Sequence, residues 1–153
     1  MSIEEIKYQT KTASAESIYL HLKQCNDQFI PPLDKKVNLL EYSQKIFEKA
    51  ITFEAWAGHS LAGLIAAYFN DPNNLSGFIT SVSVTSDHTG QGIANELVKN
   101  CIEYAKQNKF QEIKLEVADE NDKAIALYKK FNFFAVETKN KMLQMKLRIN
   151  NLE

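Results

Sequence analysis

The sequence predicts a single α/β domain with a mixed β-sheet over residues 1–153. Its 153 residues, 44% of them apolar and 24% charged, fit one globular domain. In the first half, two neighbouring strand-like segments are joined by a tight turn, which predicts antiparallel pairing. From residue 76 onward strand and helix patterns alternate, which is typical of a crossover between strands. Together the two patterns favour strands of mixed direction in one sheet.

The first half contains short strands and two helices. In chain order we expect a strand at 3–11, a helix at 14–25, a break at 26–35, a helix at 36–50 and strands at 51–57 and 61–69. Ser14 is a good N-cap, and the acid Glu16 follows it in the first turn. Pro31 and Pro32 lie in the break. The second helix is predicted from the near-helical spacing of Leu39, Leu40, Ile46 and Phe47.

The second half is predicted from two kinds of periodicity. The expected elements are a loop at 70–75, strands at 76–85 and 113–117, helices at 90–108 and 121–131, and strands at 133–137 and 141–149. Apolar residues four apart mark one face of the long helix: Ile93, Leu97, Cys101 and Ala105. Ile113, Leu115 and Val117 alternate as expected for a strand. No repeat or low-complexity linker divides the sequence.

Charge and hydropathy exclude several classes of partner. The net charge is −1, and Arg148 is the only arginine, so we expect no nucleic acid partner. No apolar run approaches the roughly 20 residues of a membrane span, and the first residues carry acids rather than the bases of a signal peptide. A cytoplasmic protein that does not bind membranes is therefore the expectation.

The cysteines and histidines do not predict a metal site. Cys25 and Cys101 are far apart in sequence and are interpreted as buried, reduced thiols. His21, His59 and His88 lack the spacing of metal ligands, so structural or surface roles are expected.

The turn at 86–94 is the strongest candidate for a binding site. It carries Gly90 and Gly92 between a strand and a long helix. The first amides of a helix have no internal partners, so this turn is suited to an anion such as a pyrophosphate. No Gly-Lys-Ser/Thr follows, which excludes a nucleotide P-loop. A Gly-x-Gly turn can also exist for steric reasons alone.

Two blocks of sequence around this turn resemble the GCN5-related N-acetyltransferase (GNAT) family. The first block is Thr89-Gly90-Gln91-Gly92-Ile93-Ala94, and the second runs from Leu115 to Phe133 with Asn121 and Tyr128 inside it. Thr89 replaces the usual Arg or Gln, and Asn132 replaces a glycine that ends a helix. The resemblance implies the GNAT fold, a mixed, splayed sheet of about seven strands flanked by about four helices. It also implies acetyl-CoA as cofactor.

The resemblance assigns cofactor contacts residue by residue. Main-chain groups of Val82, Ser83 and Val84 would hold the pantetheine and the thioester carbonyl, and the turn amides of Thr89 to Ala94 would hold the pyrophosphate. Asn121, Ala124 and Tyr128 belong to the second cofactor block. Asn121 can also cap a helix. Lys123, Lys129 and Lys130 could meet the 3′-phosphate or simply be solvated.

The resemblance also suggests the catalytic residues. Tyr128 would protonate the departing sulfur, with a core aromatic as the alternative. Glu116 alternates away from its apolar neighbours and is the candidate base, since its interval to Tyr128 resembles that of ribosomal-protein N-terminal acetyltransferases. Glu116 could instead belong to a charged stripe with Glu112 and Lys114. Glu54 is a second candidate base.

The sequence says least about the substrate that accepts the acetyl group. The family builds this side of the cleft from the first two helices and their connection, which here contains Phe29, with Trp56 on a nearby strand. These apolar residues could bind substrate, belong to the core or form a homodimer contact. We expect an N-acetyltransferase acting on a primary amine of a small molecule or peptide by direct attack. The alternatives are a non-catalytic acyl-CoA-binding module and an O-acetyltransferase acting on a sugar.

Overall fold

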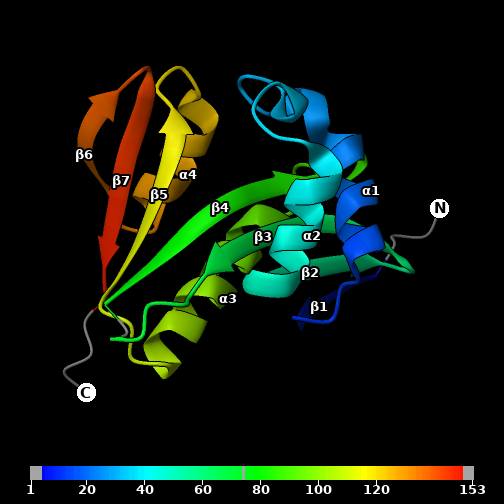
Figure 1. The fold of residues 1–153 in the computed structure, drawn as a ribbon, viewed down its shortest axis with the longest axis horizontal. Coiled ribbons are helices and arrows are strands. Elements are labelled where there is room, and N and C mark those ends of the chain that lie inside the picture. Colours follow the sequence, from blue (N-terminus) through cyan, green and yellow to red (C-terminus); the bar gives the residue numbers. More distant parts are fainter. Residues whose placement is uncertain (1–4, 74, 150–153) are drawn as a thin grey trace.

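The computed structural model describes residues 5–73 and 75–149, and they form a seven-stranded sheet with helices on both faces (Figure 1). The strands are β1 (Ile6–Thr10), β2 (Ile51–Ala57), β3 (Ser60–Tyr68), β4 (Ser76–Val84), β5 (Glu112–Ala118), β6 (Phe134–Lys139) and β7 (Met142–Arg148). The α-helices are α1 (Ala15–Cys25), α2 (Leu39–Lys49), α3 (Ile93–Gln107) and α4 (Asp122–Lys130). Short 3₁₀ turns lie at η1 (Asn26–Gln28), η2 (Leu33–Lys35) and η3 (Ser86–His88).

The strand order is β1-β2-β3-β4-β5-β7-β6. Among the described strands, β4 and β5 are parallel and every other neighbouring pair is antiparallel. The expected mixed sheet of about seven strands with four helices is thereby confirmed.

Capping residues set the starts of the helices. The Ser14 hydroxyl accepts from the Ser17 amide at 3.1 Å, so α1 begins where the sequence predicts. Helix α2 begins at Leu39 rather than at residue 36. The Asn38 side chain accepts a hydrogen bond from the Glu41 amide and so caps the helix at that point. Asn132, which follows α4 in the place of the family's glycine, has φ of 74°, in the left-handed region that asparagine tolerates.

The buried face of α2 differs from the prediction. Leu40 and Phe47 are 63% and 45% exposed, whereas Ser43 and Ile46 are buried. Adjacent helix positions are about 100° apart, so Leu39 and Leu40 cannot both face the sheet. The helix turns Leu39 and Ile46 toward the core and leaves Leu40 in solvent.

Helices cover the two faces of the sheet unequally. Figure 1 shows α1 and α2 over one face of β1–β4, α3 on the other face, and α4 beside β5, β6 and β7. The core accordingly has two clusters. One includes Phe53, Ile65, Leu97, Ile113 and Met145, and the other includes Ile18, Leu22, Ile46 and Leu64.

The sheet splits between its two parallel strands. Residues Ser76–Ile79 of β4 pair with Glu112–Leu115 of β5. Beyond Ile79, no other described strand pairs with β4 on that side, and Figure 1 shows the two strands diverging. At the same place Ala67 pairs with Ile79 while Ala66 pairs with Ser81, so Thr80 is the extra residue of a β-bulge. The predicted splayed sheet is therefore present.

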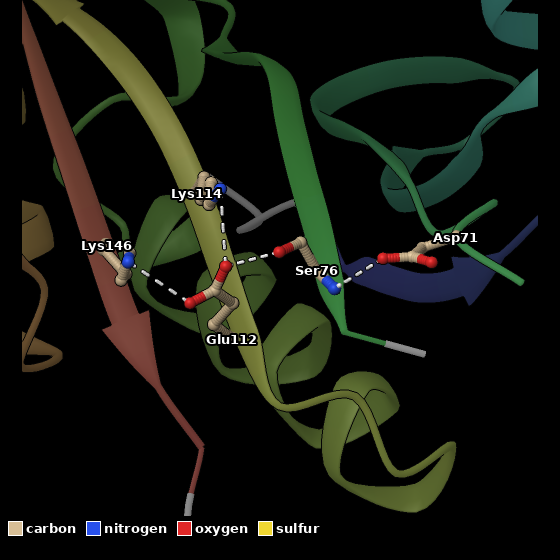
Figure 2. Close-up of polar contacts among 5 residues, drawn as sticks. All are labelled: Asp71, Ser76, Glu112, Lys114 and Lys146. Carbon is tan, nitrogen blue, oxygen red and sulfur yellow. Dashed lines mark hydrogen bonds and ion pairs between the residues drawn. The ribbon is translucent and has the colours of Figure 1, made fainter. Parts of the chain in front are cut away.

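A polar cluster ties the strands together at the closed end of the split (Figure 2). The carboxylate of Glu112 accepts from the Ser76 hydroxyl and lies 3.4 Å from Lys114 Nζ and 3.3 Å from Lys146 Nζ. The hydrogen bond from Ser76 and the nearby lysines lower the pKa of Glu112. The Ser76 amide in turn donates to Asp71 at 3.2 Å. Contacts therefore join β4, β5 and β7 just before β4 and β5 separate.

No helix in the described part of the chain is both long enough and apolar enough to cross a membrane.

Candidate active site

Two adjoining cavities lie at the split between β4 and β5. The larger, about 740 Å³, lies between the end of β4, the turn that begins α3, and α4. The smaller, about 250 Å³, lies between η1 and η2, the bulged part of β4, β5 and α4. Both are lined by Gln28, Phe29, Val82, Asn121 and Ala124. The shared residues show that the two cavities adjoin. We call them the large cavity and the small cavity, and the two together the cleft.

The turn before α3 presents free amides to the large cavity. Gly90 and Gly92 have φ of 81° and 79°, in the left-handed region that favours glycine. Gly92 is the N-cap of α3, and no side chain caps this helix, so its first amides have no intrahelical or side-chain partner. A Cβ built on either glycine meets nothing within 4 Å, so the space above the turn is open. This open cradle of amides fits a diphosphate.

The predicted turn residues divide into two groups. Thr89, Gly90, Ile93 and Ala94 line the large cavity, whereas Gln91 and Gly92 belong to the turn without lining it. The Thr89 hydroxyl donates to the Ser86 carbonyl at 3.1 Å. Its side chain therefore stabilises the turn, and what Thr89 offers a ligand is its main chain.

The end of β4 passes along the whole cleft. Val82, Ser83 and Val84 line the large cavity, and Val82 also lines the small one. Because β5 has diverged here, the edge of β4 that faces the cleft is not taken by that strand. An exposed strand edge of this kind can hydrogen-bond an extended ligand.

Helix α4 forms the opposite wall. The Asn121 side chain accepts from the Ala124 amide at 3.2 Å, so it caps α4, and it also lines both cavities. Lys123 and Lys130 line the large cavity. Lys130 Nζ donates to Asn95 Oδ1 at 2.8 Å, which bridges α4 to the first turn of α3. Lys129 does not line the cleft.

Tyr128 comes from α4 into the small cavity. It is 6% exposed, and its ring packs against Phe133 with centroids 5.8 Å apart. Burial raises the pKa of Tyr128 above its ordinary value near 10, so the phenol is protonated at neutral pH. Its aromatic ring thus belongs to the core while the residue also lines the cleft.

Glu116 lies on the strand opposite. As alternation predicts, it is exposed while Leu115 and Val117 are buried, and it lines the small cavity. Its Oε2 accepts from Gln144 Nε2 at 2.8 Å, because Gln144 is its register partner on β7. Glu112 and Lys114 share its face, but they pair with one another.

Glu54 and Trp56 lie away from the cleft. Glu54 is fully buried, and its carboxylate accepts from Thr12, Ala13, Thr52 and Trp56. Burial alone would raise the pKa of Glu54, but these hydrogen bonds outweigh it and lower the pKa. Neither Glu54 nor Trp56 lines either cavity, whereas Phe29 lines both. The structure therefore brings Phe29, but not Trp56 or Glu54, to the candidate site.

Two polar groups beside the cleft have no signal in the sequence. Tyr42 on α2 lines the small cavity and donates to the Thr80 carbonyl at 2.9 Å, which fixes the bulge; burial raises its pKa to about 12. His21 on α1 lies 3.2 Å from the Leu61 carbonyl through Nδ1 and 2.9 Å from the Ser83 hydroxyl through Nε2. Since a carbonyl only accepts, Nδ1 carries the proton. Each of these hydrogen bonds joins residues far apart in the chain, so the spacing of residues in the sequence does not predict it.

The thiols are structural. Cys25 and Cys101 are free and buried, and burial raises the pKa of both. Within residues 5–73 and 75–149, no three His, Cys, Asp or Glu side chains are grouped to hold a metal ion.

A mixed sheet opened between parallel strands, with a free helix N-terminus at one end of the opening, is the α/β architecture that the resemblance to the GNAT family implies. The sequence model of the acetyltransferase (GNAT) family matches residues 15–133, which is more than half of the chain. The protein belongs to the GNAT family.

Relatives agree with this assignment. N-alpha-acetyltransferase 30 of Schizosaccharomyces pombe is 32% identical over 59 residues, and the match spans 39% of each protein. The ribosomal-protein-S18-alanine N-acetyltransferase of Escherichia coli has the same fold, with a TM-score of 0.76 at 17% identity over 95% of this chain and 94% of that one. The PaiA N-acetyltransferase of Thermoplasma acidophilum, solved with coenzyme A, gives a TM-score of 0.74 at 14% identity, covering 94% and 99%.

Proposed function

We propose that this protein transfers the acetyl group of acetyl-CoA to a primary amine. The observation that supports this most directly is that the two cavities adjoin and share lining residues. The large cavity holds the free amides of the turn, and the small cavity holds Tyr128 and Glu116. A long ligand bound at the turn can therefore reach both side chains along the edge of β4.

The large cavity suits the cofactor. Acetyl-CoA, when bound, supplies a thioester that an amine can attack. The turn amides of Gly90 to Ala94 would hold its pyrophosphate, and the main chain of Val82 to Val84 would hold the pantetheine arm and polarise the thioester carbonyl. Asn121 and Ala124 line both cavities. Lys123 and Lys130 supply positive charge near the phosphates.

Tyr128 is the proposed acid. With acetyl-CoA bound, Tyr128 would donate its phenolic proton to the departing sulfur. The attacking nitrogen would release its remaining extra proton to water, and the phenolate would regain a proton from water. The raised pKa keeps this proton in place at neutral pH. Burial disfavours the thiolate as well as the phenolate, so a thiol held in the same cavity would also have a raised pKa, which offsets the raised pKa of the phenol.

Glu116 is the proposed base, and Gln144 orients it. The carboxylate takes a proton from the incoming ammonium group, while the bond from Gln144 holds Oε2 on the side of β7. A carboxylate is a weak base, but holding two reactants together can contribute roughly 7–11 kcal/mol by itself. The named N-acetyltransferases among the relatives act on amines, which supports this class of acceptor.

Release of free thiol from acetyl-CoA, measured across peptide amino termini, amino sugars and polyamines, tests the proposal. Tyr128→Phe and Glu116→Gln should each lower kcat by about 10²- to 10⁴-fold, because each removes a group that would transfer a proton in the reaction. Tyr8→Phe and Glu120→Gln are matched controls, because both residues are exposed and lie outside the cavities.

Unchanged turnover in Tyr128→Phe would remove the acid assignment. Binding of coenzyme A without acetylation of any amine would identify a binding module instead of an enzyme.

A further inference from the structure

The charges of the small cavity restrict the acceptor. Of the residues that line it, Lys36 and Glu116 alone carry charge. One carboxylate can pair with one ammonium group. A second cation inside the cavity would find no second carboxylate in its lining, and an unpaired charge in such a place is costly. The cavity therefore disfavours an acceptor that places two cationic groups inside it.

Most of the wall that the α1–α2 connection contributes is apolar, and Gln28 and Lys36 are its polar members. The apolar part of this wall consists of Phe29, Ile30, Pro31, Leu33 and Val37. An amino sugar carries several hydroxyl groups that would lose their bonds to water against this wall. An apolar substituent would instead gain free energy by leaving water.

The size of the cavity limits that substituent. A volume of about 250 Å³ lies below the roughly 300–1,000 Å³ of sites that enclose drug-sized ligands. The cavity therefore accommodates the reacting amine and one neighbouring group, and any remaining part of the acceptor must lie outside it.

Resting on the proposed function, we infer that the acceptor is a primary amine whose adjacent carbon carries an apolar side chain of the size of methionine or leucine. Glu116 receives the ammonium group, and the wall formed by Phe29, Ile30, Pro31, Leu33 and Val37 receives the side chain. A peptide amino terminus and an amino-acid amide share this chemistry.

Kinetics on short peptides that differ in their first residue provide the test. Peptides beginning with Met or Leu should exceed those beginning with Ser or Asp in kcat/KM by about 10- to 200-fold. Methioninamide is assayed alongside them: turnover equal to the Met peptide indicates an amino-acid amide, and lower turnover indicates a peptide amino terminus. Equal turnover of the Ser and Met peptides, or better turnover of spermidine, overturns the inference.

Binding separates this inference from the proposed function. The same peptides are titrated by calorimetry into the protein saturated with coenzyme A. Tighter binding of the Met peptide without any acetylation supports the inference and refutes the enzyme, whereas equal binding of the Met and Ser peptides overturns the inference.

A variant of the wall supplies a further readout. Ile30 is 40% exposed, so Ile30→Asp should fold, yet it should reduce the preference for the Met peptide at least tenfold. Leu40→Asp is the matched control, because Leu40 is 63% exposed on α2 and lies outside the cavity. If the two variants have the same preference, the wall does not select the substrate.

Discussion

The two glutamates that the sequence offered as bases have opposite surroundings. Glu54 is fully buried and accepts hydrogen bonds from two backbone amides and three side chains, so its carboxylate fixes the start of α1 against β2. Glu116 is exposed to the cleft and is held by Gln144. A carboxylate saturated with donors is a poor proton acceptor, whereas one with a single donor can take a proton from a substrate. Surroundings rather than residue type therefore separate the two roles.

His21 makes the stability of the protein dependent on pH. It is 2% exposed, and burial lowers its pKa to about 4. Because the unfolded chain binds this proton with a pKa near 6.5, the stabilisation is complete above pH 6.5 and is lost as the pH falls toward 4. The free energy of unfolding should fall by about 2 kcal/mol between pH 7 and pH 5 from this residue alone.

Urea unfolding at several pH values between 7 and 5 measures this loss. His21→Gln should flatten the dependence, even though the variant is less stable at pH 7. His59→Gln should keep the dependence of the wild type, because His59 is exposed in the β2–β3 turn. A dependence that survives in His21→Gln would place the titrating group elsewhere.

At the scale of elements, β4 shapes the site through its bulge. Before Thr80, Ile79 packs into the cluster beneath α3; after it, Val82 and Val84 pack there. The extra residue therefore changes which side chains face each way, and Ser83 turns to His21 on α1. The bulge lies where pairing with β5 ends, so the change of direction and the opening of the cleft occur together.

Local signals predicted the helices and strands. Contacts between distant segments decide which helix face is buried and which polar groups meet at the site. Caps such as Ser14, alternation around Glu116 and the two glycines of the turn operate within a few residues, and the structure agrees with them. The buried face of α2 depends on what packs against it, and the Tyr42 to Thr80 and Gln144 to Glu116 bonds depend on the pairing of strands and helices. A single sequence does not record such pairings.

The turn before α3 can be tested by replacing Gly92, which should change both the stability of the protein and its affinity for coenzyme A. Gly92 has φ of +79° and open space around its missing side chain, so Gly92→Ala should cost about 1–2 kcal/mol through backbone strain. The amides that follow should also shift away from the diphosphate. Losing one charge-assisted hydrogen bond would then weaken coenzyme A binding about tenfold or more.

Gly58→Ala is a closely matched control. Gly58 has φ of +64° and equally open space, but it lies in the β2–β3 turn outside both cavities. Chemical unfolding should report similar destabilisation for the two variants, whereas calorimetry with coenzyme A should report weaker binding for Gly92→Ala alone. Equal affinities would mean that the turn does not hold the ligand.

At the scale of the molecule, the cleft lies between two halves of one sheet. Strands β1–β4 with α1, α2 and α3 form one half, and β5–β7 with α4 form the other. They are joined by the short pairing of β4 with β5 and by the polar cluster at Glu112. The large cavity is lined from both halves, by β4 and the start of α3 on one side and by α4 on the other. A ligand there contacts both halves at the open end, where direct strand pairing is absent.

Coenzyme A should therefore stabilise the whole molecule rather than the turn alone. At a concentration 100 times its Kd, it should add about 2.7 kcal/mol to the free energy of unfolding. For a chain of this size that corresponds to a rise in Tm of about 5–11 °C. Because the ligand bridges the halves, amide hydrogen exchange should slow in α4 as well as at the end of β4 and in the first turn of α3. Protection confined to the turn, with α4 unchanged, would show that the ligand binds to one half only and that the cleft does not work as a single site.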